Sequence, residues 1–209
     1  MLLFSRVLTL TGSPRRVMPF AAEVTGYVNS HSSLQLSCWA ASFGYPLGTV
    51  AWSAIVESQA ALVGETSKLL GDDGYLDMVE KAADLVSAPG QDTLREIVYG
   101  APGDPPPIGA VSQVTTAIAA TDRMADALGW AVEIAQHVEG VIGAPVAVLT
   151  ELFGQLGGIT WIAVQPDIAA ADSSRGKLAA DSSYLGKLVA TKDVFLPGSG
   201  QVGQLTRIA

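Results

Sequence analysis

The chain has 209 residues, enough for one large domain or two small ones with a buried core. Its hydrophobic fraction of 49% and charged fraction of 15% exclude an intrinsically disordered chain. The formal net charge of -8, without any cluster of basic residues, disfavours nucleic-acid binding because the phosphate backbone is also negative.

The first half of the chain predicts a β-α-β-β-α-β order, since apolar residues recur at strand spacing and at helix spacing. The predicted strands cover residues 2–10, 34–43, 49–56 and 93–99. The first helix begins at the Ser13-Pro14 pair, or near Met18 because Pro19 interrupts the pattern. Two helical segments, 58–70 and 74–86, follow the third strand.

A stiff segment then divides the chain. Residues 100–107 contain three consecutive prolines, which cannot donate hydrogen bonds to a strand, and we expect a linker there. The second half, 108–209, repeats the order of the first half, 1–99. Its predicted strands cover residues 110–119, 145–153, 159–164 and 201–208. Its helices begin at a cap on Thr121 or Asp122 and continue as 167–180 and 182–190.

The two halves also match residue by residue. A shift of 109 positions places Trp52 on Trp161, and the same shift places Tyr75 on Tyr184. A repeat near half the chain length indicates a duplicated domain. The predicted fold class is therefore α+β, with two tandem ferredoxin-like repeats packed sheet to sheet as a pseudo-dimeric α/β barrel. We expect the two apolar sheet faces to cover each other and to carry few polar side chains.

Short segments resemble a known superfamily. They are Thr49-Val-Ala-Trp52, Ser58-Gln-Ala-Ala-Leu62 and Asp72-Asp-Gly-Tyr75, repeated as Ile159-Thr-Trp161, Asp167-Ile-Ala-Ala and Asp181-Ser-Ser-Tyr184. With these segments the chain resembles the dimeric α/β-barrel superfamily, and its NIPSNAP-like members most of all. The resemblance implies the fold over the whole chain. The superfamily includes monooxygenases, chlorite dismutase-like enzymes and proteins without demonstrated chemistry, so the fold alone selects no activity.

His31 and His137 are the only histidines, and each lies near the end of the first helix of its half. One interpretation is a pair that binds a ligand, haem or a metal, or that transfers protons near neutral pH. The other is a helix-end histidine that caps carbonyl groups and is favoured by the helix dipole. The sequence offers no set of carboxylates that would complete a metal site.

Trp52 and Trp161 have two interpretations as well. They form the floor of a ligand cavity, or they fill core volume as strand tryptophans usually do. Asp72 and Asp181 are expected to cap the helices that carry Tyr75 and Tyr184. Cys38 lies in an apolar run and is expected to be a buried, unreactive thiol.

The sequence lacks recognisable catalytic motifs. Gly198-Ser-Gly200-Gln-Val-Gly203 matches a dinucleotide-binding string, but too few residues follow for the required helix. The sequence contains no G-x-S-x-G, H-E-x-x-H or phosphate-binding loop, so no catalytic residue and no metal ligand is assigned.

Two functional hypotheses follow. The first is a non-enzymatic structural or assembly protein that forms homo-oligomers or docks on a larger assembly, such as a phage particle. The alternative is a small-molecule-binding or monooxygenase-like barrel enzyme, with a pocket between the sheets that reaches the tryptophans and one histidine. Only this alternative implies a cofactor, haem or flavin. The absence of a basic leader and of a long apolar segment predicts a cytoplasmic protein, or a virion component, without membrane contact.

Overall fold

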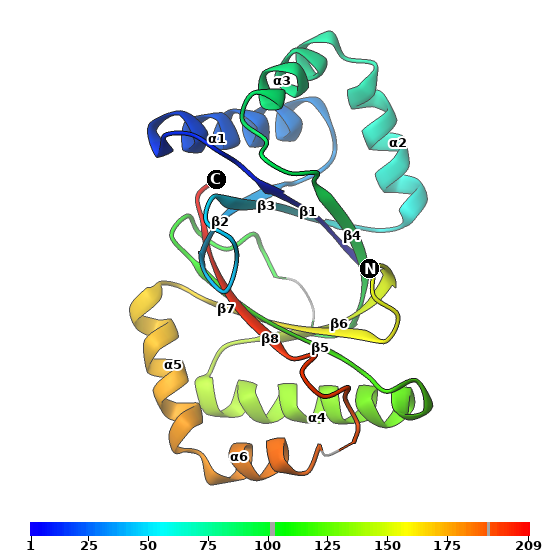
Figure 1. Cartoon of the computed structure of the whole chain (residues 1–209), viewed down its shortest axis with the longest axis vertical. Coiled ribbons are helices and arrows are strands. Elements are labelled where there is room, and N and C mark those ends of the chain that lie inside the picture. The colour runs from blue at the N-terminus through cyan, green and yellow to red at the C-terminus, as the bar shows by residue number, and fades with distance from the viewer. Residues whose placement is uncertain (101–102, 192) are drawn as a thin grey trace.

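The computed structural model describes residues 1–100, 103–191 and 193–209. In this part of the chain eight antiparallel strands form one closed barrel, in the order β1-β3-β2-β8-β5-β7-β6-β4. Figure 1 shows α1, α2 and α3 on one side of the barrel, and α4, α5 and α6 on the opposite side.

Each half contributes four strands and its own helices. The first half consists of β1 (Leu2–Thr9), α1 (Pro14–His31), β2 (Ser37–Phe43), β3 (Thr49–Val56), α2 (Gln59–Leu70), α3 (Asp73–Ala83) and β4 (Gln91–Tyr99). The second half consists of β5 (Val111–Ile118), the 3-10 turn η1 (Thr121–Arg123), α4 (Met124–Ile142), β6 (Val146–Phe153), β7 (Gly158–Gln165), α5 (Ile168–Ala180), α6 (Ser182–Val189) and β8 (Gln201–Arg207). The predicted fold class, two ferredoxin-like repeats in a pseudo-dimeric barrel, is confirmed.

The halves are joined by two strand pairs. Within each half the strands pair with one another, and β2 then pairs with β8 while β4 pairs with β6. These two pairs close the sheet, so that the barrel has no free edge. We call them the β2–β8 seam and the β4–β6 seam.

Of the two predicted starts of the first helix, the Ser13-Pro14 pair is confirmed: the Ser13 hydroxyl accepts a hydrogen bond from the Arg15 backbone N–H, and Pro19 lies inside the helix. Other element boundaries differ from the prediction. In the second half the expected cap at residue 121 or 122 is wrong. There the chain first makes the tight turn η1, closed by a hydrogen bond from Arg123 N to Ala120 O, and α4 begins only after it.

The second strand begins at Ser37 and not at residue 34. The Asn29 side chain explains the difference, because its amide donates to Leu36 O over 3.0 Å and accepts from Leu36 N over 2.7 Å. The backbone of Leu36 is therefore bonded to α1 and is not available to a neighbouring strand.

The apolar cores lie outside the barrel, between the strands and the helices. In the first half Val17, Ala21 and Val28 of α1 pack with Val50 and Trp52 in one buried cluster. In the second half a matching cluster consists of Ala127, Ala131 and Ala135 of α4 with Val148 and Ile159 of the sheet. The inner strand faces therefore do not form the single apolar core that we expected.

The predicted linker, residues 100–107, is described only in part, because residues 101–102 lie outside the described residues. Pro105, Pro106 and Pro107 border the barrel interior, and the Arg207 guanidinium donates a hydrogen bond to Pro106 O. The domain boundaries at 99 and 108 stay a prediction, because the two halves share one sheet. No helix in the described ranges has the length and apolar character needed to cross a bilayer.

Candidate functional site: the barrel cavity

The barrel encloses a cavity of about 1320 Å³. Side chains alternate across a strand, so every second residue of each strand points inward. All eight strands contribute to the lining, which includes Ser5, Trp39, Ser53, Arg95 and Thr160 among its residues. The volume is sufficient for a polycyclic small molecule.

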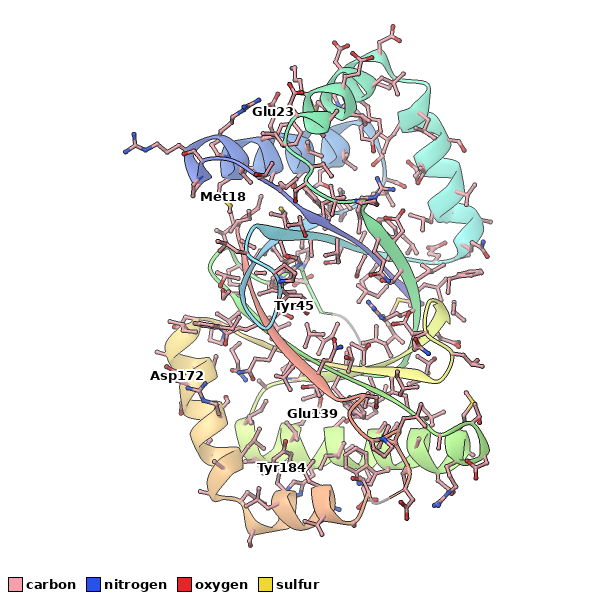
Figure 2. All side chains as sticks on the ribbon, viewed as in Figure 1. Met18, Glu23, Tyr45, Glu139, Asp172 and Tyr184 are labelled. Atoms are coloured by element: carbon pink, nitrogen blue, oxygen red, sulfur yellow. The ribbon has the colours of Figure 1, made fainter. Side chains whose placement is uncertain are left out.

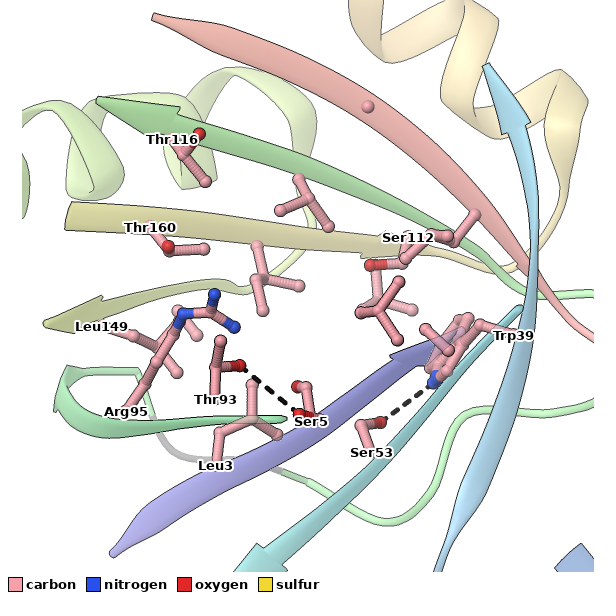
Figure 3. Close-up of a pocket in the computed structure, with 18 of the residues that line it drawn as sticks. Leu3, Ser5, Trp39, Ser53, Thr93, Arg95, Ser112, Thr116, Leu149 and Thr160 are labelled. Carbon is pink, nitrogen blue, oxygen red and sulfur yellow. Dashed lines mark hydrogen bonds between the residues drawn. The ribbon is translucent and has the colours of Figure 1, made fainter. Parts of the chain in front are cut away.

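Hydroxyl groups are frequent on the inner face. They belong to Ser5, Ser37, Ser53, Thr93, Ser112, Thr116 and Thr160. Figure 3 shows the Trp39 indole N–H donating to the Ser53 hydroxyl over 2.9 Å, and the Thr93 hydroxyl donating to the Ser5 carbonyl over 3.5 Å. The expectation of few polar side chains on the inner strands is therefore wrong. The outward positions between them include Phe4, Val50 and Trp52, which belong to the apolar cluster under the helices of the first half.

A partly buried ion pair lies in the cavity wall at the β4–β6 seam. Arg95 and Glu151 are register partners, and Arg95 Nε donates to Glu151 Oε1 over 2.5 Å. Their side chains are only 18% and 10% exposed. Among the described residues, Nε is the only nitrogen of this guanidinium with a hydrogen-bond partner, so both terminal amino groups are free to meet a ligand.

The Glu151 carboxylate also borders the cavity, next to the β6–β7 turn. Its Oε2 atom is buried without a hydrogen-bond partner in the described part of the chain. It lies against the β6–β7 turn, since a Cβ atom on Gly154 would fall 2.9 Å from it. Figure 3 shows the Arg95 guanidinium directed into the lumen near Thr93, so its terminal amino groups face the cavity.

The opposite wall is apolar. Trp39, Ala51 and Leu205 are buried there, and Tyr45 packs against them from the β2–β3 turn. Figure 2 places Tyr45 beside the lumen. Burial raises the pKa of the Tyr45 hydroxyl, and the positive charge of Arg95 lowers it in part, so the phenol stays protonated at neutral pH.

Gly203 makes room for the Tyr45 ring. A Cβ atom at position 203 would lie 2.3 Å from Tyr45 Cε2, which is far inside van der Waals contact. Gly203 is the last glycine of the segment 198–203, and its role on strand β8 is therefore to leave space for the Tyr45 ring.

The predicted tryptophans face the helices. Trp52 Nε1 donates to the Thr25 hydroxyl on α1 over 3.0 Å, and Trp161 Nε1 donates to Ala131 O on α4 over 3.0 Å. Neither residue is part of the lining of the large cavity in the described chain, although Trp52 borders a smaller void of about 440 Å³ under α1 and α3. Ligand binding by these two residues stays a prediction.

The two histidines also lie outside the cavity lining among the described residues. His31 stacks on Tyr27 with ring centroids 3.9 Å apart, and its Nδ1 atom is 3.0 Å from Tyr27 O at the end of α1. His137 Nε2 is 3.2 Å from Asp181 Oδ1. The helices α1 and α4 lie on opposite sides of the barrel (Figure 1), so the histidines do not meet in one site. Their role in ligand binding stays a prediction.

The expected helix caps at Asp72 and Asp181 and the expected burial of Cys38 are confirmed. Asp72 and Asp181 cap α3 and α6, because each accepts a hydrogen bond from the backbone N–H of Tyr75 or Tyr184, over 2.9 and 2.7 Å. Cys38 is buried, and its burial raises the pKa of the thiol to about 11. Within the described residues no group of three or more His, Cys, Asp or Glu side chains is arranged to hold a metal ion.

Neither a protein-family model nor the sequence of a curated protein matches the chain. Solved structures do match over its full length. A protein from Fusobacterium nucleatum that is named as a monooxygenase has a TM-score of 0.74 at 10% identity, with 100% of this chain and 92% of that chain covered. An anthrone oxidase-like protein has a TM-score of 0.67 at 12% identity, with 100% and 91% covered. A monooxygenase by name from Lactobacillus acidophilus has a TM-score of 0.65 at 13% identity, with 100% and 94% covered.

These findings correct the first functional hypothesis. A structural or assembly protein, with the virion component as its example, was expected because the inner strands were thought to lack polar groups. The cavity is lined by such groups, and three solved structures that share the fold are named as monooxygenases or as an anthrone oxidase-like protein. Self-association as a homo-oligomer, which is a separate expectation, stays a prediction. The chain has the dimeric α/β-barrel fold, with both halves of the barrel in one polypeptide.

Proposed function

We propose that the protein is a small-molecule-binding barrel of the monooxygenase-like kind, which takes an apolar, polycyclic ligand into its central cavity. The observation that carries the proposal is the cavity of about 1320 Å³ inside the closed barrel, with hydroxyl groups, one guanidinium and an apolar wall on its lining. An apolar chamber with a few converging polar groups is the usual form of a small-molecule site.

The names of the structural neighbours suggest the reaction class. In the oxidation of an anthrone, the methylene carbon loses two hydrogens and gains one oxygen atom from O2. The second oxygen atom leaves as water, so that anthrone and O2 give anthraquinone and water. Removal of the first proton leaves negative charge on the carbonyl oxygen, and a guanidinium such as that of Arg95 stabilises this charge in a buried site.

The lining in the described chain contains no histidine, cysteine or methionine that could serve as an axial ligand to a haem iron, but it does contain Tyr45, and a tyrosine can ligate haem iron. Haem and flavin both stay predictions, and the same assay tests each when haem or flavin mononucleotide is added.

The experiment is an oxygen-uptake assay with anthrone, combined with the absorbance of anthraquinone. A cavity-filling variant, Thr116→Trp, places an indole on the inner face of β5. Ser173→Trp, on the exposed surface of α5, is its matched control. We expect the wild-type protein and the control to bind and oxidise anthrone, and Thr116→Trp to lose both activities. Absence of both binding and turnover in the wild-type protein, with and without flavin, would contradict the proposal.

A further inference from the structure

The two seams that close the barrel occupy equivalent positions in the duplicated chain. In the β4–β6 seam Arg95 is the register partner of Glu151, and in the β2–β8 seam Leu205 is the register partner of Ala41. A shift of 110 positions converts Arg95 into Leu205 and Ala41 into Glu151. The Arg95–Glu151 pair and the Leu205–Ala41 pair therefore occupy equivalent positions in the two halves, with charged side chains in one seam and apolar side chains in the other.

The difference between the seams gives the cavity two unlike ends. At the β4–β6 seam the free amino groups of Arg95 enter the lumen, whereas the Glu151 carboxylate lies against the β6–β7 turn. At the β2–β8 seam Leu205 belongs to an apolar cluster with Trp39 and Tyr45. The strand order places β4 and β8 four positions apart in the ring of eight, which is the largest possible separation.

The cavity holds no competing charge near Arg95 other than its own partner. The charged residues of the lining in the described chain are Arg95, Glu151 and Asp104. Asp104 is exposed on the linker between the halves. A guanidinium whose free donors face a cavity with low-dielectric walls binds an oxygen anion more strongly than one in bulk water, because the hydrogen bonds are charge-assisted and less screened.

We propose that the cavity selects and orients ligands that carry an oxygen anion, a carboxylate or an enolate, at one end of an apolar ring system. The anion binds the Arg95 amino groups at the β4–β6 seam, and the ring system lies against Trp39 and Leu205 at the β2–β8 seam. This inference rests on the proposed function, since it names the class of ligand for the same cavity.

The test compares three fluorescent probes that share one ring system. They are anthracene-9-carboxylate, 9-anthracenemethanol and 9-(methylaminomethyl)anthracene, which are anionic, neutral and cationic. We expect the carboxylate to bind the wild-type protein at least about 10-fold more tightly than the alcohol, and the cation most weakly. Equal binding of all three, blocked by Thr116→Trp, would overturn the anion site but leave the proposed function intact. Failure of all three to bind would overturn both.

The position of the anion is tested by changing one seam into the other. The double variant Arg95→Leu/Glu151→Ala gives the β4–β6 seam the side chains that the β2–β8 seam already has. We expect it to bind the alcohol as before and to lose the preference for the carboxylate. Arg95→Lys keeps the charge and should retain most of the preference. The matched control Arg123→Leu/Asp126→Ala removes an exposed ion pair near the start of α4 and should change nothing. A carboxylate preference that survives Arg95→Leu/Glu151→Ala would overturn the inference.

An enolate is tested with anthrone, which becomes an anion only when a proton is removed. Bound next to Arg95, anthrone should show its enolate absorbance at a lower pH than it does in free solution, and Arg95→Leu/Glu151→Ala should abolish this shift. If the enolate absorbance appears at the same pH with and without the protein, the enolate part of the inference is wrong.

Discussion

The Tyr27 hydroxyl and the His137 imidazole occupy matching places in the two halves of the chain. Tyr27 donates to Asp72 Oδ1 over 2.5 Å, and His137 Nε2 lies 3.2 Å from Asp181 Oδ1. Each aspartate is also the N-cap of the helix that follows it, α3 or α6. One carboxylate in each half therefore joins the first helix to the last helix of its layer.

Asp181 makes the free energy of unfolding depend on pH in the acidic range. The pKa of its carboxyl group is lowered, first by the hydrogen bond from the Tyr184 backbone N–H and then by His137. A lowered folded-state pKa stabilises the protein above the ordinary aspartate value of about 3.9, and this contribution is lost as pH falls through the folded value. Asp181→Asn keeps a competent cap without this titration. The stability advantage of the wild-type protein over Asp181→Asn should therefore shrink as pH falls from about 5 to below the ordinary aspartate value in urea unfolding. A difference that stays constant over this range would contradict the prediction.

Cys38 should be chemically silent in the folded protein. Its thiol is buried, and burial raises its pKa to about 11, so almost no thiolate forms at neutral pH. We expect an aromatic disulfide reagent to label it at least about 100-fold more slowly in the native protein than in urea at about pH 8. Rapid native labelling would show that the thiol is accessible.

The same burial should lower the free energy of unfolding as pH rises from the unfolded thiol pKa of about 8.5 through the folded value of about 11.

Trp52 should matter for stability and not for binding in the large cavity. Its indole N–H has the Thr25 hydroxyl as partner in a buried contact. Thr25→Val leaves that N–H unpaired, which should cost about 1–3 kcal/mol, and Trp52→Ala should cost about 3–5 kcal/mol through lost packing. Urea unfolding measures both. Affinity for anthracene-9-carboxylate should stay unchanged in Thr25→Val, and a loss of affinity in that variant would instead support the ligand-binding role predicted for Trp52.

Gly203 and Tyr45 should be energetically coupled. Gly203→Ala drives a Cβ atom into the Tyr45 ring, so the ring must leave its place, and overpacking of this kind costs about 1–3 kcal/mol. In a Tyr45→Ala background the same substitution should be nearly neutral, because its obstacle is gone. A double-mutant cycle read by urea unfolding measures the coupling. Additive effects would mean that the ring does not limit position 203.

The sequence predicted the fold because the duplication repeats local signals. The pairs Trp52 and Trp161, and Asp72 and Asp181, mark the same strand and the same cap in each half, and local signals of this kind survive without tertiary information. Local signals did not predict which face of each strand points into the barrel. One face of each strand packs on helices and the other faces the interior of the closed barrel, so that neither face lies on the outer surface and polar and apolar alternation does not tell which face is inside.

The candidate site was harder to predict for a second reason. Arg95 and Glu151 are 56 positions apart and lie in different halves. They become neighbours only because β4 and β6 pair at a seam, and no motif in either half marks that pairing. The site can be noticed when the two repeats are compared position by position, because Arg95 stands where the other half has Leu205.

The same comparison predicts how the ion pair responds to substitution. Arg95→Leu alone leaves the partly buried Glu151 carboxylate without its cation. Breaking a fully buried pair in this way costs about 3–5 kcal/mol, which is the upper bound for the cost here. The double variant Arg95→Leu/Glu151→Ala removes both charges and reproduces the Leu205 and Ala41 pair of the other seam. We therefore expect the double variant to be more stable than the single one and close to the wild-type protein in urea unfolding. If the double variant were the less stable of the two, the ion pair would be needed to close the barrel, and its place at the cavity would be structural rather than a provision for a ligand.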